Sequence, residues 1–337
     1  MIIRDNKTVS NSPYIFEVND ECKGMRLDKF LKLKISGIQQ SHLEKLIGSG
    51  SIRVNKKKSK PSTKLNLGEQ VSIPPKLKDQ KFTQKIKDKF IPLKNDINLI
   101  KSSLIKEEND FIALNKPYGI AVQGGSKLNR HIDGLIKYAF ENIEQHFLVH
   151  RLDRDTTGVF LIAKNRSFAK EISEYFKYNT IEKIYIAIVC GNVENNEGTI
   201  DVPIIKGKIG KAEKVIVDKK NGLKSITKYK VFGSSENYSL LLLFPKTGRT
   251  HQIRVHLSHI GNPILGDKKY GGEFKIKNNL NKTVSLKLHC LQMSFPYGKM
   301  KKNIINAKLN NDFSDSLKLL KLDQFIDTIY RYIENEF

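Results

Sequence analysis

The stretch that decides the fold is HRLDRDTTG at residues 150–158, followed directly by the apolar run VFLIA at 159–163. Five consecutive positions of this stretch hold two arginines and two carboxylates: Arg151, Asp153, Arg154 and Asp155. The apolar run predicts a buried strand, but it does not explain the charges before it, because burial of charge is costly unless the charges are paired. We therefore expect these side chains at the mouth of a packed sheet, where groups with tuned chemistry gather.

The composition indicates a polyanionic partner. The 337 residues carry a formal charge of +24, part of which reflects a general excess of lysine, and lysine and arginine bind nucleic acid by releasing its counterions. The arginines are the more specific signal, because four of the ten lie in two short motifs. No span reaches the ~20 apolar residues of a membrane helix, and the first residues lack the apolar core of a secretory signal. These features predict a cytoplasmic protein without a membrane partner.

The three cysteines, Cys22, Cys190 and Cys290, are far apart in the sequence and form no CxxC pair. We expect them to be small buried hydrophobes in a reducing compartment. A disulfide or a thiolate zinc site is not expected.

The chain divides into a small and a larger domain. The small domain, residues 1–75, contains a helical pattern over 24–34 and a second helix that a capping box at Ser41–Glu44 begins. Two short strands are expected over 51–55 and 70–73. Two helices and a small sheet bury little surface, so this is a minimal module, and its lysines flank a turn between strands, which favours an RNA-contacting surface.

The rest of the chain begins with a polar, lysine-rich segment, residues 76–99, which is interpreted as a basic linker. The larger domain is expected over 100–310. The C-terminal segment 311–337 is expected to form a helix that Ser314 begins. Apolar or alternating runs predict strands over 111–114, 159–163, 183–189, 238–244 and 286–295, and helical spacing predicts helices over 167–178 and 249–260. Many strands with few helices between them favour an α+β domain around an antiparallel or mixed sheet.

Two further motifs carry polar residues. One is KTGRTHQIRVH at residues 246–256, in which Gly248 permits a tight turn. The other is EKIYIA at residues 182–187, and a tyrosine in such a strand, here Tyr185, is by itself usually a packing residue.

These groups are compatible with four chemistries. A metal hydrolase would use histidines and carboxylates from both motifs, but no HExxH is present and the spacing between His251 and His256 is not that of a helical zinc pair. A two-carboxylate glycosidase is disfavoured because Asp153 and Asp155 are only two residues apart, and no phosphate-binding glycine loop is present. The fourth is a single aspartate kept ionised by an arginine, which attacks an electrophilic carbon or stabilises an oxocarbenium-like sugar.

The motifs resemble those of the RluA-type pseudouridine synthases. HRLDRDTTG is similar to that family's HRLDxxTSG loop, with Thr157 in place of the more usual serine. Tyr185 in EKIYIAIVCG and Arg254 in GRTHQIRVH stand where the family has its other two active-site residues. The resemblance covers about residues 108–300 through further motifs in the expected order, and the first 75 residues resemble the S4-like (alpha-L) RNA-binding module.

The resemblance implies a role for each matching residue. Asp153 is the catalytic aspartate that attacks the uridine or assists loss of its base, Arg254 pairs with it, and Tyr185 stacks on the base and is the candidate for handling the carbon-five proton. Arg151 occupies the space that a flipped-out uridine leaves. The expected substrate-binding residues are Arg151, His150, Arg249, Arg26, Arg53 and Lys56. The reaction requires no cofactor and no metal.

The function implied is isomerisation of specific uridines in large-subunit (23S) ribosomal RNA by a monomeric cytoplasmic enzyme. The implied fold is an α+β catalytic domain with a central, mainly antiparallel sheet, preceded by the small RNA-binding module. Three alternatives remain at this point: a synthase acting on tRNA, a non-catalytic RNA-binding or ribosome-assembly protein, and a metal-dependent hydrolase. Neither the target uridines nor the state of the substrate, free RNA or assembling subunit, follows from the sequence.

Overall fold

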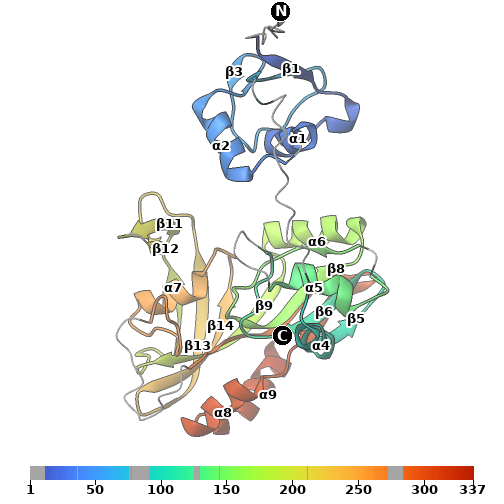
Figure 1. The fold of residues 1–337 in the computed structure, drawn as a ribbon. Coiled ribbons are helices and arrows are strands. Elements are labelled where there is room, and N and C mark those ends of the chain that lie inside the picture. The colour runs from blue at the N-terminus through green and yellow to red at the C-terminus, as the bar shows by residue number, and fades with distance from the viewer. Residues whose placement is uncertain are drawn as a thin grey trace, which may run out of the picture. The chain divides into compact units, whose positions relative to one another are not determined.

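A computed structural model describes residues 12–35, 37–75, 77, 91–124, 130–143, 145–210, 212–271 and 284–337. The chain folds into two compact units, Met1–Phe90 and Ile91–Phe337 (Figure 1). The boundary between the units falls inside the segment that the sequence analysis interprets as a linker.

The first unit is a four-stranded antiparallel sheet with two helices. The strands β1 (Tyr14–Glu17), β4 (Gln70–Ile73), β2 (Arg53–Val54) and β3 (Lys57–Lys58) lie in that order. Helices α1 (Leu27–Lys34) and α2 (Gln40–Ser49) pack on them, because the apolar positions of both helices repeat at helical spacing and are buried. The predicted helices and the strand at 70–73 are therefore confirmed.

Two local predictions for this unit are wrong. The helix α2 begins at Gln40 after Gln39, which makes no side-chain cap, so Ser41 lies within the first turn and forms no capping box. The strand expected over 51–55 has only two residues, because Asn55 and Lys56 both adopt positive φ, 50° and 64°, and form a tight turn into β3. This turn presents the exposed side chains of Lys56, Lys57 and Lys58 together.

The second unit is built on one large sheet of ten strands in its described residues. Its strand order is β10-β13-β14-β9-β15-β8-β6-β5, with β16 added to β15 and β7 to β8. All recorded pairs are antiparallel except β15 with β8, so the predicted α+β class with a mainly antiparallel sheet is confirmed. The bounds are β5 Leu104–Glu107, β6 Phe111–Lys116, β7 Phe147–Leu148, β8 Thr157–Ala163, β9 Glu182–Cys190, β10 Glu197–Asp201, β13 Ile226–Ser235, β14 Tyr238–Pro245, β15 Leu288–Tyr297 and β16 Met300–Asn306.

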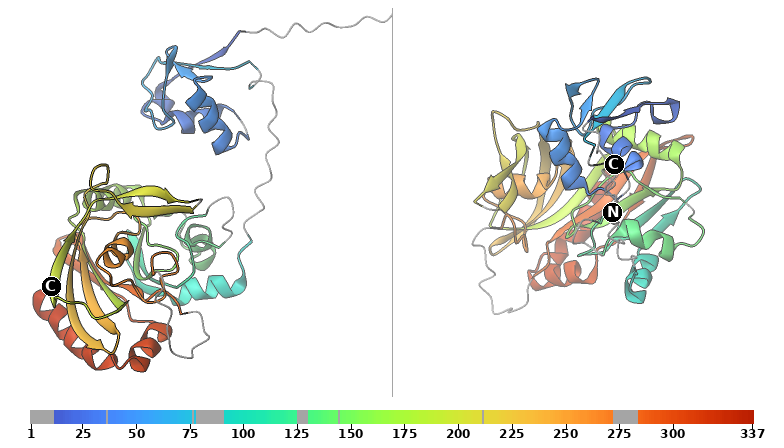
Figure 2. Two further views of the ribbon diagram at one scale, coloured as in Figure 1. Left: turned by 90° about the vertical axis from the view of Figure 1, so that its left-hand side faces the viewer. Right: turned by 45° about the horizontal axis from the view of Figure 1, so that its top comes forward.

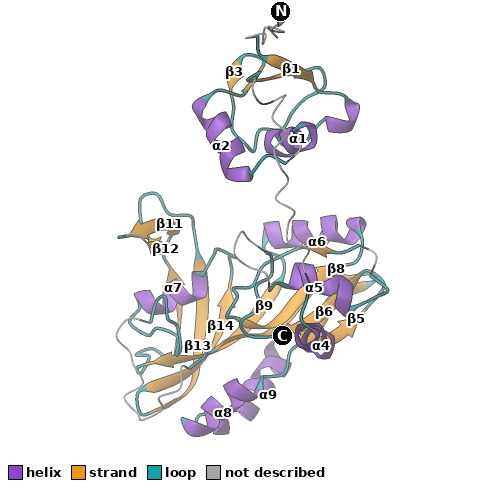
Figure 3. Cartoon of the chain, in the orientation of Figure 1, coloured by secondary structure: helices purple, strands orange, loops and turns teal. Residues whose placement is uncertain are grey.

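Helices cover both faces of this sheet (Figure 3). The alternation of β9 turns Ile184, Ile186 and Ile188 toward the C-terminal helices, with which they form one apolar cluster. Tyr185 therefore points to the opposite face. A separate two-stranded hairpin stands off the large sheet (Figure 2). The bounds are α4 Lys94–Ser102, α5 Ile132–Ala139, α6 Arg166–Tyr178, α7 Gln252–His259, α8 Asn311–Leu319 and α9 Ile326–Glu336, and β11 Ile204–Ile209 with β12 Ala212–Val217 in the hairpin.

The helical segments differ from expectation at three places. Residues 94–99, assigned to the linker, belong to α4 (Lys94–Ser102), which packs beside α5. The helix expected over 249–260 begins only at Gln252, because His251 has a φ of 54°. The expected C-terminal helix is two helices, α8 and α9, because Lys321 between them also has positive φ.

All three cysteines are buried and unbridged, which confirms their expected role as small apolar groups. In the described part of the chain, no helix has both the length and the apolarity to cross a membrane.

Candidate active site

The charged loop at residues 150–158 ends where β8 meets β15. Gly158 has a φ of 104°, and a Cβ at this position would lie 2.1 Å from the carbonyl oxygen of Cys290. Only glycine permits this close approach of the two strands. The neighbouring Thr157 hydroxyl lies 2.8 Å from Nδ1 of His289, so the threonine fills a structural role that serine could also fill.

Lys116 at the end of β6 stabilises this loop through hydrogen bonds to its backbone. Its fully buried Nζ donates hydrogen bonds to the carbonyl oxygens of Pro117 at 3.0 Å, Arg154 at 2.9 Å and Thr156 at 2.9 Å. Burial lowers the pKa of Lys116 to about 7, although the negative charges of Asp155 and Asp153 oppose this shift. The sequence indicates this role only weakly, through a lysine that follows the apolar run 111–114 after a single asparagine.

Asp153 lies in this loop, and its carboxylate pairs with a residue from a distant part of the chain. Its Oδ2 accepts a hydrogen bond from Nη1 of Arg254 at 3.1 Å, so the structure brings together the two residues that the family resemblance paired. The Asp153 side chain is 23% exposed, whereas Arg254 is buried. Among the described residues, no hydrogen bond reaches the other carboxylate oxygen of Asp153, Oδ1.

Arg254 is itself fixed by a second carboxylate, Asp267. Nε and Nη2 of Arg254 donate to the two oxygens of Asp267 at 2.8 and 2.7 Å, and Asp267 Oδ1 also accepts the backbone N–H groups of Lys269 and Tyr270. This bidentate pair holds the guanidinium in one orientation. No role for Asp267 could be predicted from the sequence, because the turn that contains it contacts Arg254 only in the folded protein.

The charges of this pair are stabilised despite burial. Burial alone would lower the pKa of Arg254, but its hydrogen bonds and attraction to Asp267, and then to Asp153, raise the pKa above its usual value. Burial would raise the pKa of Asp267, and the hydrogen bonds from Arg254 lower it overall. The arginine therefore remains a cation facing Asp153.

Tyr185 is almost fully buried on the face of β9 opposite α8 and α9. Burial, followed by the thiol of Cys290 and the charge of Asp153, raises its pKa well above the usual value. The phenol is therefore protonated at neutral pH in the unliganded protein.

The other candidate residues of the loop and of the 246–256 motif differ in their exposure. His150 is turned into the fold, where its Nε2 accepts the N–H of Leu161 at 2.8 Å and its ring stacks on Phe176. Burial lowers the pKa of His150 to about 3, so the ring is neutral. Arg151 is exposed, and Arg249 is exposed with its Nε donating to the carbonyl of Lys224.

The conspicuous neighbours Arg154 and Asp155 pair with each other through Nε and Oδ1 at 3.0 Å. Three further candidates, Arg26, Arg53 and Lys56, belong to the first unit. Arg26 forms a bidentate pair with Asp28, Arg53 donates to the carbonyls of Gly50 and Lys56, and the Lys56 side chain is exposed.

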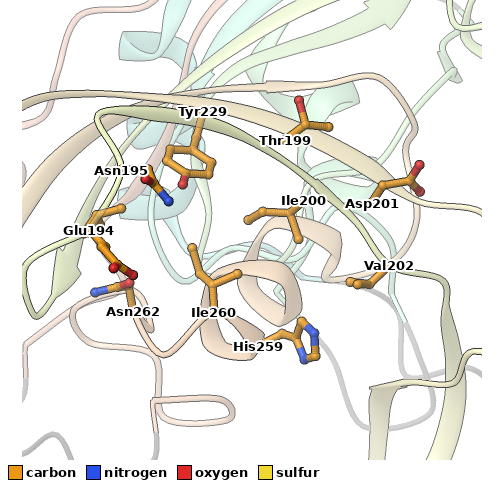
Figure 4. A pocket seen from close by; sticks show the side chains of 11 residues that line it. Glu194, Asn195, Thr199, Ile200, Asp201, Val202, Tyr229, His259, Ile260 and Asn262 are labelled. Carbon is orange, nitrogen blue, oxygen red and sulfur yellow. The ribbon is translucent and has the colours of Figure 1, made fainter.

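Of the residues weighed as metal ligands, Asp153 and His251 lie 3.7 Å apart, but no third one joins them in the described part of the chain. His256 is buried between the hydroxyl of Thr227 and the carbonyl of Val202, and His150 is engaged with β8. Within the described residues, no three histidine, cysteine or carboxylate side chains form a metal-ligand cluster. A separate pocket lies at the C-terminal end of α7, and Asp153 is not among the residues that line it (Figure 4). Its lining includes Glu194, Thr199, Asp201, Tyr229 and His259.

The comparisons with known proteins agree with the fold described above. Residues 110–259 match the family model of RNA pseudouridylate synthases, and residues 25–71 match the S4 domain. A ribosomal large subunit pseudouridine synthase C from Buchnera aphidicola is 37% identical over 91% of this chain and 97% of that protein. The chain belongs to the RluA-type family of RNA pseudouridylate synthases. The synthase is also 32% identical to the ribosomal large subunit pseudouridine synthase C of Haemophilus influenzae, over 95% of this chain and 99% of that one.

Two solved human structures share the fold of the synthase. The human RNA pseudouridylate synthase domain containing 4 matches with a TM-score of 0.57 and 26% identity, over 67% of this chain and 95% of that chain. The human RNA pseudouridylate synthase domain containing 1 matches with a TM-score of 0.53 and 25% identity, over 64% and 85% of the two chains. The enzyme class expected from the motifs, an isomerase that forms pseudouridine, is therefore confirmed.

Proposed function

We propose that this synthase converts specific uridines of large-subunit ribosomal RNA to pseudouridine, with Asp153 as its catalytic residue. The observation that carries the proposal is the asymmetric setting of the Asp153 carboxylate. Oδ2 is bound by a buried arginine that a second carboxylate holds in place, while Oδ1 has no hydrogen bond among the described residues. The pairing places a buried positive charge against one oxygen of Asp153 and leaves the other oxygen for the substrate.

In the proposed reaction, the target uridine leaves its stack and enters the site beside Asp153. Arg151, exposed two residues from Asp153, takes the space the base has left. Asp153 attacks the nucleoside or assists departure of its base, the bond between N1 and the sugar carbon breaks, and the base turns. A bond then forms between carbon five and the same sugar carbon, which releases Asp153 where it has been attached. Carbon five loses its proton and N1 gains one. Tyr185, which is protonated before the reaction, is the proposed relay: it takes up the proton from carbon five as its own proton passes toward N1. The product is an isomer, so no group is gained or lost.

Ribosomal RNA is the proposed substrate because the relatives above are named for the ribosomal large subunit and match nearly the whole chain. The S4 match adds an RNA-binding unit. We propose that the synthase acts in the cytoplasm, because its proposed substrate is ribosomal RNA, and that it acts as a monomer, because one chain supplies Asp153, Arg254 and Asp267.

The test is incubation of the purified synthase with unmodified large-subunit rRNA, small-subunit rRNA and tRNA, followed by mapping of pseudouridine. We expect modification of a few uridines in the large-subunit RNA alone, and equal activity with a chelator present. Modification confined to tRNA would contradict the proposed substrate. Loss of activity to the chelator would instead favour metal-dependent chemistry.

The basic turn of the first unit is proposed to contact RNA phosphates. Replacing Lys56, Lys57 and Lys58 with alanine should reduce the slope of log Kd against log salt by up to about 2, because each lost phosphate contact removes roughly 0.7 from it. The rate of the bound complex should not change. A control with alanine at the exposed Lys228, Lys318 and Lys321 of the second unit should keep the wild-type slope. Equal slopes for all three proteins would show that the turn is only solvated surface.

A further inference from the structure

His251 faces the same carboxylate oxygen that Arg254 binds. Its Nε2 lies 3.7 Å from Oδ2 of Asp153, somewhat beyond a direct hydrogen bond, and its side chain is 19% exposed. The residue precedes α7 with a φ of 54°, a conformation that is uncommon for residues other than glycine.

Tyr270 determines which nitrogen of His251 carries the proton. The Tyr270 hydroxyl lies 2.6 Å from Nδ1 of His251 and accepts the backbone N–H of Val215 at 3.1 Å. Among the described residues, Nδ1 is the one acceptor within hydrogen-bond distance of the Tyr270 hydroxyl proton, so we assign Nδ1 as the acceptor of this bond. A neutral imidazole then has its proton on Nε2, the nitrogen that faces Asp153.

The surroundings of His251 favour the neutral ring. Burial lowers the pKa of His251, and the negative charge of Asp153 only partly opposes this. Tyr270 is held by several contacts: its N–H donates to Asp267, its carbonyl accepts from the Ser258 hydroxyl, and the Arg254 guanidinium lies 5.1 Å from the centre of its ring. The tyrosine therefore presents a fixed hydroxyl to the histidine.

We propose that His251 is a positioning residue for Asp153: its Nε2–H faces Oδ2 beside Arg254 and attracts it electrostatically, and Tyr270 favours the tautomer that makes this possible. The consequence is a carboxylate whose Oδ2 is kept toward Arg254 and His251, which leaves Oδ1 for the substrate. The inference rests on the proposed catalytic role of Asp153. It also connects the hairpin to the site, because Val215 lies on β12 and packs in one apolar cluster with Val255 of α7.

The test compares two replacements of His251 in the full chain under single-turnover conditions. Asparagine tolerates positive φ, but its short side chain does not reach Asp153, whereas glutamine places an amide N–H near the position of Nε2. We expect His251→Asn to slow pseudouridine formation by about 10-fold to 100-fold, since catalysis depends steeply on position, with less than a twofold change in RNA Kd. We expect His251→Gln to recover to within about threefold of wild type.

Two further measurements separate positioning from a general effect on folding. His259→Asn, a matched replacement at the exposed end of the same helix, should leave the rate unchanged (Figure 4). Nitrogen NMR of the histidine side chains in the wild type should show His251 protonated at Nε2 and unprotonated at Nδ1. Tyr270→Phe should lose this tautomer preference and fall between wild type and His251→Asn in rate.

The possible outcomes decide between the alternatives. A wild-type rate in His251→Asn, a folded His251→Gln as slow as His251→Asn, or a proton on Nδ1 in the wild type would each overturn the proposal. Full activity in Asp153→Asn would instead refute the proposed role of the aspartate. The two failures are therefore distinguishable.

Discussion

Replacement of Asp153 by asparagine is expected to lower the single-turnover rate of pseudouridine formation at least about 1,000-fold. The amide has neither the negative charge nor the nucleophilicity that the reaction needs. The variant should fold normally, because Arg254 keeps its bidentate pair with the buried Asp267. RNA should bind with unchanged or slightly higher affinity, since one negative charge near the phosphates is removed. The measurements are single-turnover rate, RNA Kd and thermal melting.

Asp155→Asn is the matched control for this prediction. Asp155 lies two residues away in the same loop. Its carboxylate pairs with the exposed Arg154 and, among the described residues, accepts no hydrogen bond from Arg254. An exposed ion pair contributes little, so the rate should stay within about threefold of wild type. A rate for Asp153→Asn within tenfold of wild type would contradict the assignment. Equal losses in both variants would indicate that the charge of the loop matters and not one carboxylate.

The elements that could be predicted from the sequence are those whose burial pattern is local. The strand β14 is a run of apolar residues covered on both faces, β9 alternates, and α6 has one apolar stripe. The pairing of Asp153 with Arg254, 101 residues apart, came from the resemblance of the motifs and not from spacing.

The features that could not be predicted depend on backbone conformation or on distant contacts. His251 and Lys321 adopt positive φ, which shortens one helix and divides another, and neither residue type marks such a position. Asp267 and Tyr270 reach Arg254 and His251 only through the turn after α7. His251 was considered as a metal ligand because its type suggests one, and only its hydrogen bond to Tyr270 indicates its orientation.

Lys116→Met should weaken both the fold of the second unit and its catalysis. Methionine has a similar shape but cannot donate to the carbonyls of Pro117, Arg154 and Thr156. The neutral amine present at pH 9 donates to two of these three at a time, so the loss is about 1–3 kcal/mol for each of two buried carbonyls. We expect a loss of a few kcal/mol in the free energy of unfolding at pH 9, measured by chemical denaturation. Displacement of the loop that carries Asp153 should also slow the single-turnover rate at least about tenfold. Lys228→Met, a replacement of an exposed lysine on β13, should change neither quantity.

The pH dependence of this difference tests the state of the buried amine. The pKa of Lys116 is about 7 in the folded protein against 10.5 for an unperturbed lysine, so the unfolded chain binds more protons between these values. The stability contributed by Lys116 therefore rises with pH from 7 to about 10, by at most about 1.4 kcal/mol per pH unit, and is least below pH 7. The advantage of the wild type over Lys116→Met should grow accordingly as the pH is raised. If the stability difference between the two proteins stayed constant over this range, Lys116 would remain a charged ammonium group. The carbonyls would then accept hydrogen bonds from an ammonium ion and orient the loop in that way.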